Sequence, residues 1–186
     1  MEIDIENIAL FGGSFDPPHI AHVAIVKALL DFREIEKVIV MPTFLNPFKS
    51  NSFAPSSLRV RWLKEVFAGY ENVEVSDFEL KKQKKVPTIE SVEFLLKRYK
   101  KIYLVIGADN IKSLHKWHRY EELKELVSFI VATRDGIEIP KEFLKLHIDK
   151  NISSTMLRKK IEAPLIPKEC KEDVLSYYTK KENNAK

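Results

Sequence analysis

Residues 12–22 read Gly-Gly-Ser-Phe-Asp-Pro-Pro-His-Ile-Ala-His and decide the fold, because they join an apolar strand to an apolar helix. The run at residues 8–11 is typical of a buried parallel strand. The glycine pair that ends it permits backbone angles closed to other residues and lets a ligand approach the main chain. Prolines suit the first positions of a helix, so the sequence predicts a helix from about Pro18.

The start of this helix has the features of an anion site. His19 and His22 lie three residues apart, so helical spacing places both on one side of the first turn. Open backbone amides and the positive end of the helix dipole converge at the same place, where anions bind. The dipole favours a neutral imidazole, which still donates one hydrogen bond. An ordinary turn with two unrelated histidines is the alternative, but their joint occurrence favours the anion site.

A second helix start of this kind lies at residues 152–158, Ile-Ser-Ser-Thr-Met-Leu-Arg. Ser and Thr are preferred N-caps, and a helix from about Ser154 directs amides and hydroxyls towards an anion. Arg158, one turn later, adds a permanent cation. Capping alone is the usual use of Ser-Ser-Thr. Two such starts in one chain nevertheless predict one site that holds a polyphosphate from both sides.

Strand and helix patterns alternate along the chain. Further strands are expected at residues 38–41, 73–75, 102–106 and 129–132, with helices at 58–67, from a Thr88 cap, and over 110–126. This order predicts an α/β fold, a Rossmann-like doubly wound parallel sheet of about five strands with helices on both faces. Ligands bind at the carboxyl ends of such strands, where Gly12 and Gly107 fall.

Composition predicts one globular domain over residues 1–186, because 45% of the chain is hydrophobic and 31% is charged. We expect a C-terminal helical segment at about 153–180 and a frayed end at 181–186. The lone Cys170 excludes an internal disulfide, no apolar run exceeds a strand, and the acidic start is unlike a signal peptide. A cytoplasmic protein with no membrane partner is therefore expected.

The charge of the chain is weak evidence for a nucleic acid partner, because the net charge is only +4. Part of it is concentrated in the lysines of residues 81–85, which we interpret as a solvated turn. We therefore expect no nucleic acid partner. The sequence leaves open whether the chain forms a homo-oligomer.

Residues 12–22 resemble the phosphate-binding signature GGxFDPxHxGH of the nucleotidyltransferase superfamily, with Ala21 in place of the usual second-last glycine. Residues 152–158 resemble the ISSTxxR motif of the same superfamily, whose members transfer AMP or CMP onto phosphorylated acceptors. The resemblance implies that His19, His22 and Arg158 are catalytic. It also implies that ATP is bound by Gly12, Gly13, Ser14, Phe15, His19, His22, Gly107, Asp109, Ile152, Ser153, Ser154, Thr155 and Arg158.

Three further segments resemble the bacterial nicotinate mononucleotide adenylyltransferases. Residues 104–111 and 117–123 follow the IGxDxxxxxxxWxxxxEL pattern, and residues 131–136 follow its strand-Arg-x-Gly pattern. A PPHK-like segment carries Lys49, although Asn46 and Phe48 depart from it, and a T-I-x-T-like helix start carries Thr88, although Pro87 departs there. The resemblance implies that nicotinate mononucleotide is bound by Lys49, Thr88, Asp109, Trp117 and Arg134.

The physical chemistry of these residues agrees with such roles. Trp117 offers a flat π-face to a cationic pyridinium ring, and Asp109 can accept from ribose hydroxyls or help to place Mg²⁺. Taken alone, a tryptophan is more often a core residue, Lys49 would be an exposed loop residue, and Arg134 would suit a surface salt bridge equally well. The family pattern favours the binding roles.

The expected reaction is transfer of AMP from ATP to nicotinate mononucleotide, which gives nicotinate adenine dinucleotide and pyrophosphate on the route to NAD. A phosphate monoester acceptor is already anionic, so direct in-line attack needs no general base and no covalent intermediate. Arg158 and the groups near Ser154 would hold the β and γ phosphates. No cluster of carboxylates forms a protein metal site in the sequence, so we expect Mg²⁺ to be bound mainly through the ATP phosphates.

Two alternatives remain open from sequence. Another superfamily member, such as a phosphopantetheine adenylyltransferase or a cytidylyltransferase, would lack the Trp117 segment and the Thr88 helix start in this arrangement. A catalytically silent nucleotide-binding or RNA-associated protein would keep the fold, but the intact His19, His22 and Arg158 argue against it.

Overall fold

A parallel sheet forms the centre of the molecule in the computed structural model, which describes residues 6–45, 51–133 and 138–184. Its six strands have the order β3-β2-β1-β4-β5-β6, and every neighbouring pair is parallel. The strands are β1 (Asn7–Gly13), β2 (Lys37–Pro42), β3 (Val73–Val75), β4 (Lys101–Gly107), β5 (Val127–Thr133) and β6 (Leu144–His147). The expected doubly wound α/β sheet is confirmed, with six strands instead of about five.

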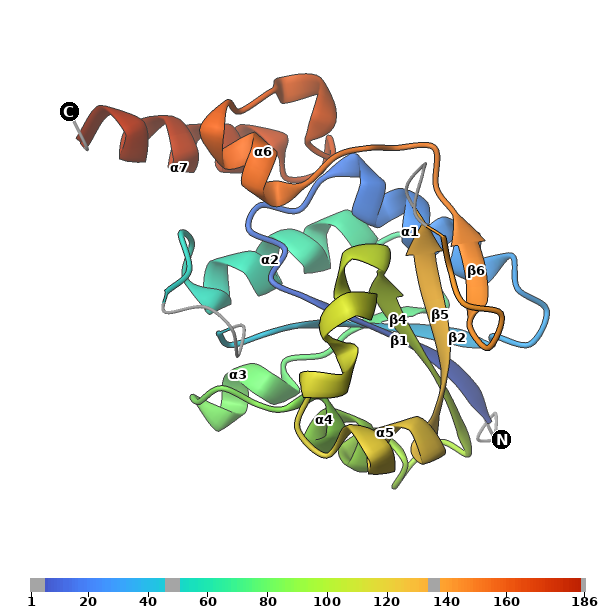
Figure 1. Ribbon diagram of the computed structural model, residues 1–186. Coiled ribbons are helices and arrows are strands. Elements are labelled where there is room, and N and C mark those ends of the chain that lie inside the picture. Colours follow the sequence, from blue (N-terminus) through green and yellow to red (C-terminus); the bar gives the residue numbers. More distant parts are fainter. Residues whose placement is uncertain (1–5, 46–50, 134–137, 185–186) are drawn as a thin grey trace.

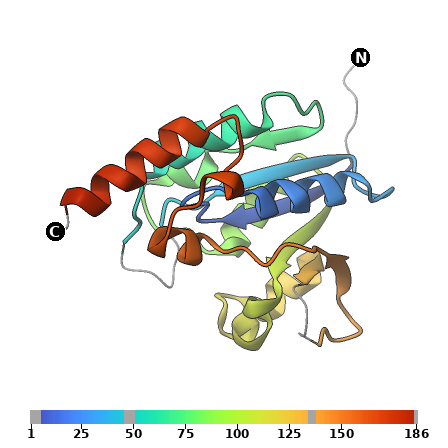
Figure 2. The same cartoon turned by 90° about the horizontal axis from the view of Figure 1, so that it is seen from above.

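Helices cover both faces of this sheet (Figure 1). One face carries α1 (Ile20–Leu30), α2 (Ser56–Phe67), α6 (Ser154–Lys159) and α7 (Lys171–Asn184), with the short 3₁₀ helix η2 (Ala163–Leu165) between the last two. The other face carries α3 (Phe78–Lys82), α4 (Thr88–Leu95), the 3₁₀ helix η1 (Ala108–Lys116) and α5 (Tyr120–Leu126). Figure 2 shows α7 lying along α2, where the rings of Trp62 and Tyr177 meet at 5.8 Å.

Strand alternation produces a separate core on each face, because successive side chains of a strand point to opposite sides. In β1, Ala9 and Phe11 join the core beneath α1 and α2, whereas Ile8 and Leu10 join the core beneath α4 and α5. All four are buried. The continuous apolar runs that predicted the inner strands are therefore runs buried on both faces.

The sixth strand was not expected from sequence. Strand β6 has four residues at the edge of the sheet, and only Leu146 among them is buried. An edge strand with one buried position lacks the continuous apolar run by which the inner strands were recognised. Its presence extends the sheet beyond β5 and places residues 148–152 next to the start of α6.

The region predicted as one helix over 110–126 is instead two elements, which is a correction. The 3₁₀ helix η1 ends at Lys116, and α5 begins at Tyr120. Trp117 adopts an extended backbone that ends the first segment, and Arg119 adopts a left-handed one with φ 53° just before the second begins. The break turns Trp117 out of any helix and into the wall of a cavity.

Three smaller predictions also need correction. Thr88 is the first residue of α4 and does not cap it, because Pro87 occupies the N-cap position and offers no side-chain acceptor. Lys81 and Lys82 belong to α3, so only the end of the lysine segment is a turn. The chain does not fray from residue 181, because α7 continues to Asn184.

The sheet order creates one crevice at its carboxyl edge. The chain proceeds outwards from β1 to β3 on one side and from β4 to β6 on the other, so the winding direction changes between β1 and β4. Ligands of doubly wound sheets bind at this change. Gly13 ends β1 and Gly107 ends β4, so both glycines stand at the crevice.

Candidate active site

In the turn at the end of β1, glycine is favoured by a lack of room for a side chain, and not by backbone angles that other residues rarely adopt. Neither Gly12 nor Gly13 has a positive φ, whereas Phe15 has φ 48°, so the expected conformational role of the glycine pair is wrong. A Cβ at Gly13 would lie 3.2 Å from the ring of Phe15, tighter than ordinary van der Waals contact. The second role, an open approach to the main chain, agrees with both glycines lining a cavity.

His19 and His22 come together as predicted. His19 is the N-cap of α1 and is buried, and the two rings stack with their centroids 3.6 Å apart. The backbone N–H of His19 donates to Nδ1 of His22 at 3.1 Å. A neutral imidazole whose Nδ1 accepts carries its proton on Nε2, so Nε2 of His22 is assigned as the donor.

The second signature lies against the first, as the sequence predicted. Helix α6 begins at Ser154, and Ser153 caps it by accepting from the N–H of Met156 at 3.1 Å. The hydroxyl of Ser154 donates to the carbonyl oxygen of Pro17 at 2.8 Å. Arg158 donates to the carbonyl oxygen of Asp16 at 2.6 Å and to the hydroxyl of Thr155 at 3.0 Å. We call residues 12–22 and 152–158 together the clamp.

A buried carboxylate fixes the clamp from behind. Asp16 is 3% exposed, and its carboxylate accepts from the backbone N–H groups of Phe53 at 2.8 Å and Ala54 at 2.9 Å. The hydroxyl of Tyr178, in α7, also donates to it. Burial raises the pKa of Tyr178, and the nearby Asp16 charge adds to this, so the tyrosine stays a donor.

A buried arginine fixes the same turn from the side of α2. Arg59 is fully buried and donates to the carbonyl oxygens of Ser14 at 2.5 Å and Ala54 at 3.1 Å, and to those of Thr43 and Phe44 at 2.9 and 3.0 Å. Burial lowers the pKa of this guanidinium, and Asp16 opposes that effect. The sequence did not predict these roles of Asp16, Arg59 and Tyr178, because no local motif indicates contacts between segments that lie so far apart in the sequence.

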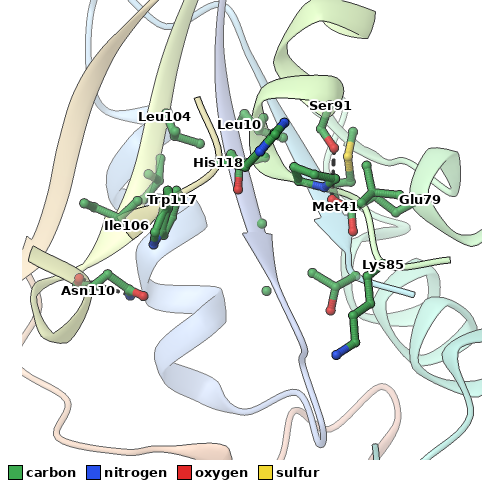
Figure 3. Close-up of a pocket in the computed structure, with 18 of the residues that line it drawn as sticks. Leu10, Met41, Glu79, Lys85, Ser91, Leu104, Ile106, Asn110, Trp117 and His118 are labelled. Atoms are coloured by element: carbon green, nitrogen blue, oxygen red, sulfur yellow. Dashed lines mark hydrogen bonds between the residues drawn. The ribbon is translucent and has the colours of Figure 1, made fainter. Parts of the chain in front are cut away.

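A cavity of about 370 Å³ opens beside the glycine turn (Figure 3). Its apolar wall comes from strand residues, among them Leu10, Met41, Leu104 and Ile106. Figure 3 shows Trp117 on one side of it and Glu79 with Ser91 on the other. We call it the larger cavity, because a second cavity at the same crevice, described below, is smaller. Its remaining lining residues are Gly12, Gly13, Thr43, Lys85, Val86, Pro87, Thr88, Val105, Gly107, Asn110, Lys116 and His118.

Three buried polar atoms in this wall lack a hydrogen-bond partner among the described residues. They are Oγ1 of Thr43, Oε2 of Glu79 and Nε1 of Trp117. Buried polar groups are normally satisfied, and an unsatisfied one costs about 1–3 kcal/mol. All three belong to residues that line the larger cavity, so a polar ligand there would supply partners after a small side-chain movement. Trp117 was predicted for this place, whereas Thr43 and Glu79 were missed.

A smaller cavity of about 150 Å³ lies on the other side of Gly107. Its lining residues are Phe11, His19, Ala21, His22, Ile25, Gly107, Ala132, Thr133, Ile148, Lys150 and Ile152. Gly107 lines both cavities. A Cβ there would lie 2.5 Å from Oδ1 of Asp109, so the missing side chain leaves room for that carboxylate. Ala21, the departure from the signature, is 4% exposed within this wall.

The remaining predicted site residues differ in where they lie. Phe15 is buried between Phe11 and His22, with its ring 4.8 Å from the His22 ring, and so supports the clamp. Asp109 is exposed at the start of η1 and lines neither cavity. Lys49 and Arg134 lie outside the described residues, as do the departures Asn46 and Phe48.

The described part of the chain contains neither a metal-binding cluster of side chains nor a membrane-spanning helix. No group of three or more His, Cys, Asp or Glu side chains there is close enough to hold a metal ion. None of the described helices is long and apolar enough to cross a lipid bilayer.

Comparisons with known proteins agree with one another. Residues 10–160 match the cytidylyltransferase-like family. A protein of Sulfurimonas denitrificans named "Probable nicotinate-nucleotide adenylyltransferase" is 59% identical over 174 residues, which cover 94% of this chain and 96% of that protein. A protein of Aliarcobacter butzleri with the same name is 48% identical over 181 residues, which cover 95% of this chain and 100% of that protein.

One solved structure supports the fold. "Plasmodium falciparum nicotinic acid mononucleotide adenylyltransferase complexed with NaAD" has a TM-score of 0.73 and 21% identity, over 95% of this chain and 96% of that one.

Proposed function

This chain belongs to the nicotinate-nucleotide adenylyltransferase family, and from that membership we propose how its two cavities carry out the reaction. The reaction is transfer of AMP from ATP to nicotinate mononucleotide, which yields nicotinate adenine dinucleotide and pyrophosphate in NAD biosynthesis. One observation carries the assignment of residues. The larger cavity, with its unsatisfied polar atoms, and the smaller cavity, with the histidine pair, share Gly107.

We assign the larger cavity to nicotinate mononucleotide. Its volume of about 370 Å³ suits a small ligand, and its apolar wall with a few polar groups is typical of such sites. Trp117 would face the cationic pyridinium ring. The first amides of α4, from Thr88 onwards, would receive the nicotinate carboxylate, because the initial N–H groups of a helix have no partner within it. Pro87 contributes no amide.

We assign the smaller cavity and the clamp to ATP. The α1 start, with His19 and His22, and the α6 start, with Arg158, meet there because Ser154 and Arg158 bond to the carbonyls of the turn. Hydrogen-bond donors held before the ligand arrives stabilise developing charge without reorganisation. Arg158 and the groups near Ser154 and Thr155 would then hold the β and γ phosphates.

The chemical step is direct substitution at phosphorus. A phosphate oxygen of nicotinate mononucleotide attacks the α-phosphorus of ATP, the bond to the bridging oxygen between α and β breaks, and pyrophosphate leaves with the electron pair. The acceptor oxygen is already anionic, so no side chain has to remove a proton. His22, through Nε2, and His19 donate to phosphate oxygens as charge shifts. Positioning two reactants on either side of Gly107 supplies the remaining acceleration.

Nucleotidyltransferases generally use a divalent metal held through the ATP phosphates, and we propose Mg²⁺ here. Asp109 fits such an ion, because its exposed carboxylate reaches back over Gly107 at the crevice. One carboxylate with phosphate oxygens and water is a donor set that Mg²⁺ prefers. When bound, the ion neutralises phosphate charge.

The other expectations from sequence remain proposals. Lys49 and Arg134 would contact nicotinate mononucleotide, on the resemblance alone. Residues 1–186 would form one domain, which agrees with a single sheet through the described ranges. We place the protein in the cytoplasm, in keeping with its lone cysteine, Cys170.

Pyrophosphate release tests this assignment. The purified protein receives ATP and Mg²⁺ with nicotinate mononucleotide, nicotinamide mononucleotide or phosphopantetheine in separate reactions. We expect the fastest release with nicotinate mononucleotide, with the dinucleotide product identified by chromatography. Release with phosphopantetheine only would overturn the acceptor assignment. No release with any acceptor would identify a silent nucleotide-binding protein.

A further inference from the structure

Glu79 places a buried carboxyl group in the wall of the larger cavity. It comes from α3, is 5% exposed, and accepts a hydrogen bond of 2.9 Å at Oε1 from the hydroxyl of Ser91 in α4. Its Oε2 is buried and has no hydrogen-bond partner in the described part of the chain. Figure 3 shows this pair across the cavity from Trp117. A buried carboxyl group therefore lies in the wall of the proposed acceptor site, with Oε2 directly beneath the cavity surface.

The charges around Glu79 do not compensate for its burial. Arg59 favours the ionised form, but its guanidinium donates to backbone carbonyl oxygens. The hydroxyl of Ser91 and the amide of Phe44 favour ionisation more strongly than Arg59 does, whereas Glu90 opposes it. Burial is the largest influence and raises the pKa of Glu79 to about 7. Further titratable groups that line the same cavity are Lys85, Lys116 and His118.

We propose that Glu79 is a specificity-determining residue that meets the carboxylate of nicotinate mononucleotide as a neutral carboxylic acid, so that binding of this substrate takes up one proton. The inference rests on the proposed assignment of the larger cavity to the acceptor. Two carboxylates in one dry pocket share a proton, because both cannot stay ionised at short range. The α4 amides favour charge on the substrate carboxylate, so Glu79 holds the proton and donates it.

With this arrangement, a rise in pH weakens binding of an acceptor that carries a carboxylate, but not of one that carries a carboxamide. Ionised Glu79 repels the substrate carboxylate and has no proton to donate, so nicotinate mononucleotide binds only to the protonated form. A carboxamide donates through its NH₂ group to ionised Glu79 and accepts through its oxygen from neutral Glu79. Preference for the acid over the amide should therefore fall as Glu79 ionises.

The ratio of kcat/KM for nicotinate mononucleotide to kcat/KM for nicotinamide mononucleotide, measured from pH 6 to pH 9, tests this proposal. The phosphate groups of the two acceptors titrate alike, so their ionisation cancels in the ratio. Above about pH 7 we expect the wild-type ratio to fall towards tenfold per pH unit. Glu79→Gln should give a flat ratio. Glu90→Gln, the matched control, should keep the wild-type fall but begin it at a lower pH, because Glu90 raises the pKa of Glu79. A flat wild-type ratio would overturn the proposal.

Proton uptake gives a second readout that needs no variant. Calorimetry of acceptor binding at pH 7.5, in two buffers of different ionisation enthalpy, should show uptake of more than about half a proton with nicotinate mononucleotide and close to none with nicotinamide mononucleotide. Equal uptake with both would contradict the role of Glu79.

The two proposals fail in different ways. If wild-type protein does not turn over nicotinate mononucleotide even at pH 6.5, the proposed function fails. If turnover is present but the ratio is independent of pH and no proton is taken up, Glu79 alone is excluded as the selecting group. The wild-type measurements decide the matter even if Glu79→Gln does not fold.

Discussion

The clamp and the larger cavity differ in how their polar groups are satisfied. In the clamp, Ser154 and Arg158 bond to carbonyls of the glycine turn, and Asp16 accepts from two backbone amides and a tyrosine. In the larger cavity, Thr43, Glu79 and Trp117 each keep a buried polar atom without a partner in the described ranges. The clamp is thus held by the protein itself, whereas the larger cavity keeps polar groups that the proposed acceptor would satisfy.

This difference separates two kinds of substitution. Changes in the clamp should affect turnover or stability. The same hydrogen bonds hold the chain together and position the groups that we propose donate to the ATP phosphates. Changes in the larger cavity should affect which acceptor is used.

His22→Ala should lower kcat by at least about a hundredfold, because it removes a donor that acts on charge in the transition state. The variant should remain folded, since His22 is only partly buried. Steady-state kinetics with circular dichroism measures both. His115→Ala, an exposed histidine outside both cavities, is the matched control and should behave as wild type. An unchanged kcat for His22→Ala would remove this residue from the mechanism.

Trp117→Ala should raise KM for nicotinate mononucleotide by about tenfold or more, because ring stacking contributes about 1–3 kcal/mol. KM for ATP should change little, since Trp117 lines only the larger cavity. Trp117→Phe keeps a ring and should recover part of the loss. An equal rise in KM for both substrates would show that the two sites are not separable as described.

Tyr178→Phe should lower kcat several-fold and the free energy of unfolding by about 2 kcal/mol, because it removes a buried hydrogen bond to a carboxylate. KM for nicotinate mononucleotide should stay near the wild-type value. Tyr177→Phe, which removes a more exposed hydroxyl, is the control and should cost less. Denaturant titration and steady-state kinetics measure the two effects. Equal effects of the two substitutions would contradict the role given to Asp16.

Glu79→Gln should change the pH dependence of stability more than it changes activity near pH 6. The pKa of Glu79 is raised from 4.5 to about 7 in the folded chain, so its contribution to stability is complete below pH 4.5 and is lost as pH rises through 7. Wild-type protein should lose on the order of 3 kcal/mol between these limits relative to Glu79→Gln. Denaturant titrations across pH measure this difference. A constant difference would show that Glu79 ionises normally.

The sequence predicted those parts of the fold and site that depend on local order. The inner strands were recognised because both of their faces are buried, and the clamp because capping residues and charges lie within a few positions of one another. The edge strand around Leu146 and the break at Arg119 escaped recognition, because tertiary packing decides them.

The missed site residues share one property. Glu79 and Thr43 matter because folding buries a polar atom of each beside a cavity. Arg59 matters because it donates to four carbonyl oxygens, three of them at least 15 residues away in sequence. Nothing in the neighbouring sequence distinguishes these residues from ordinary polar residues. The acceptor site is therefore harder to predict from sequence than the clamp.

The position of Gly107 in both cavities has a consequence for inhibition. Two weak ligands, one for each cavity, can be joined by a short linker that passes Gly107 and carries a hydrogen-bond donor for the Asp109 carboxylate beside it. The second binding event then becomes intramolecular, with an effective concentration in the millimolar range for a short flexible linker. A linked compound of this kind should bind about 10²–10⁴ times more tightly than either half, before the contact with Asp109 is counted.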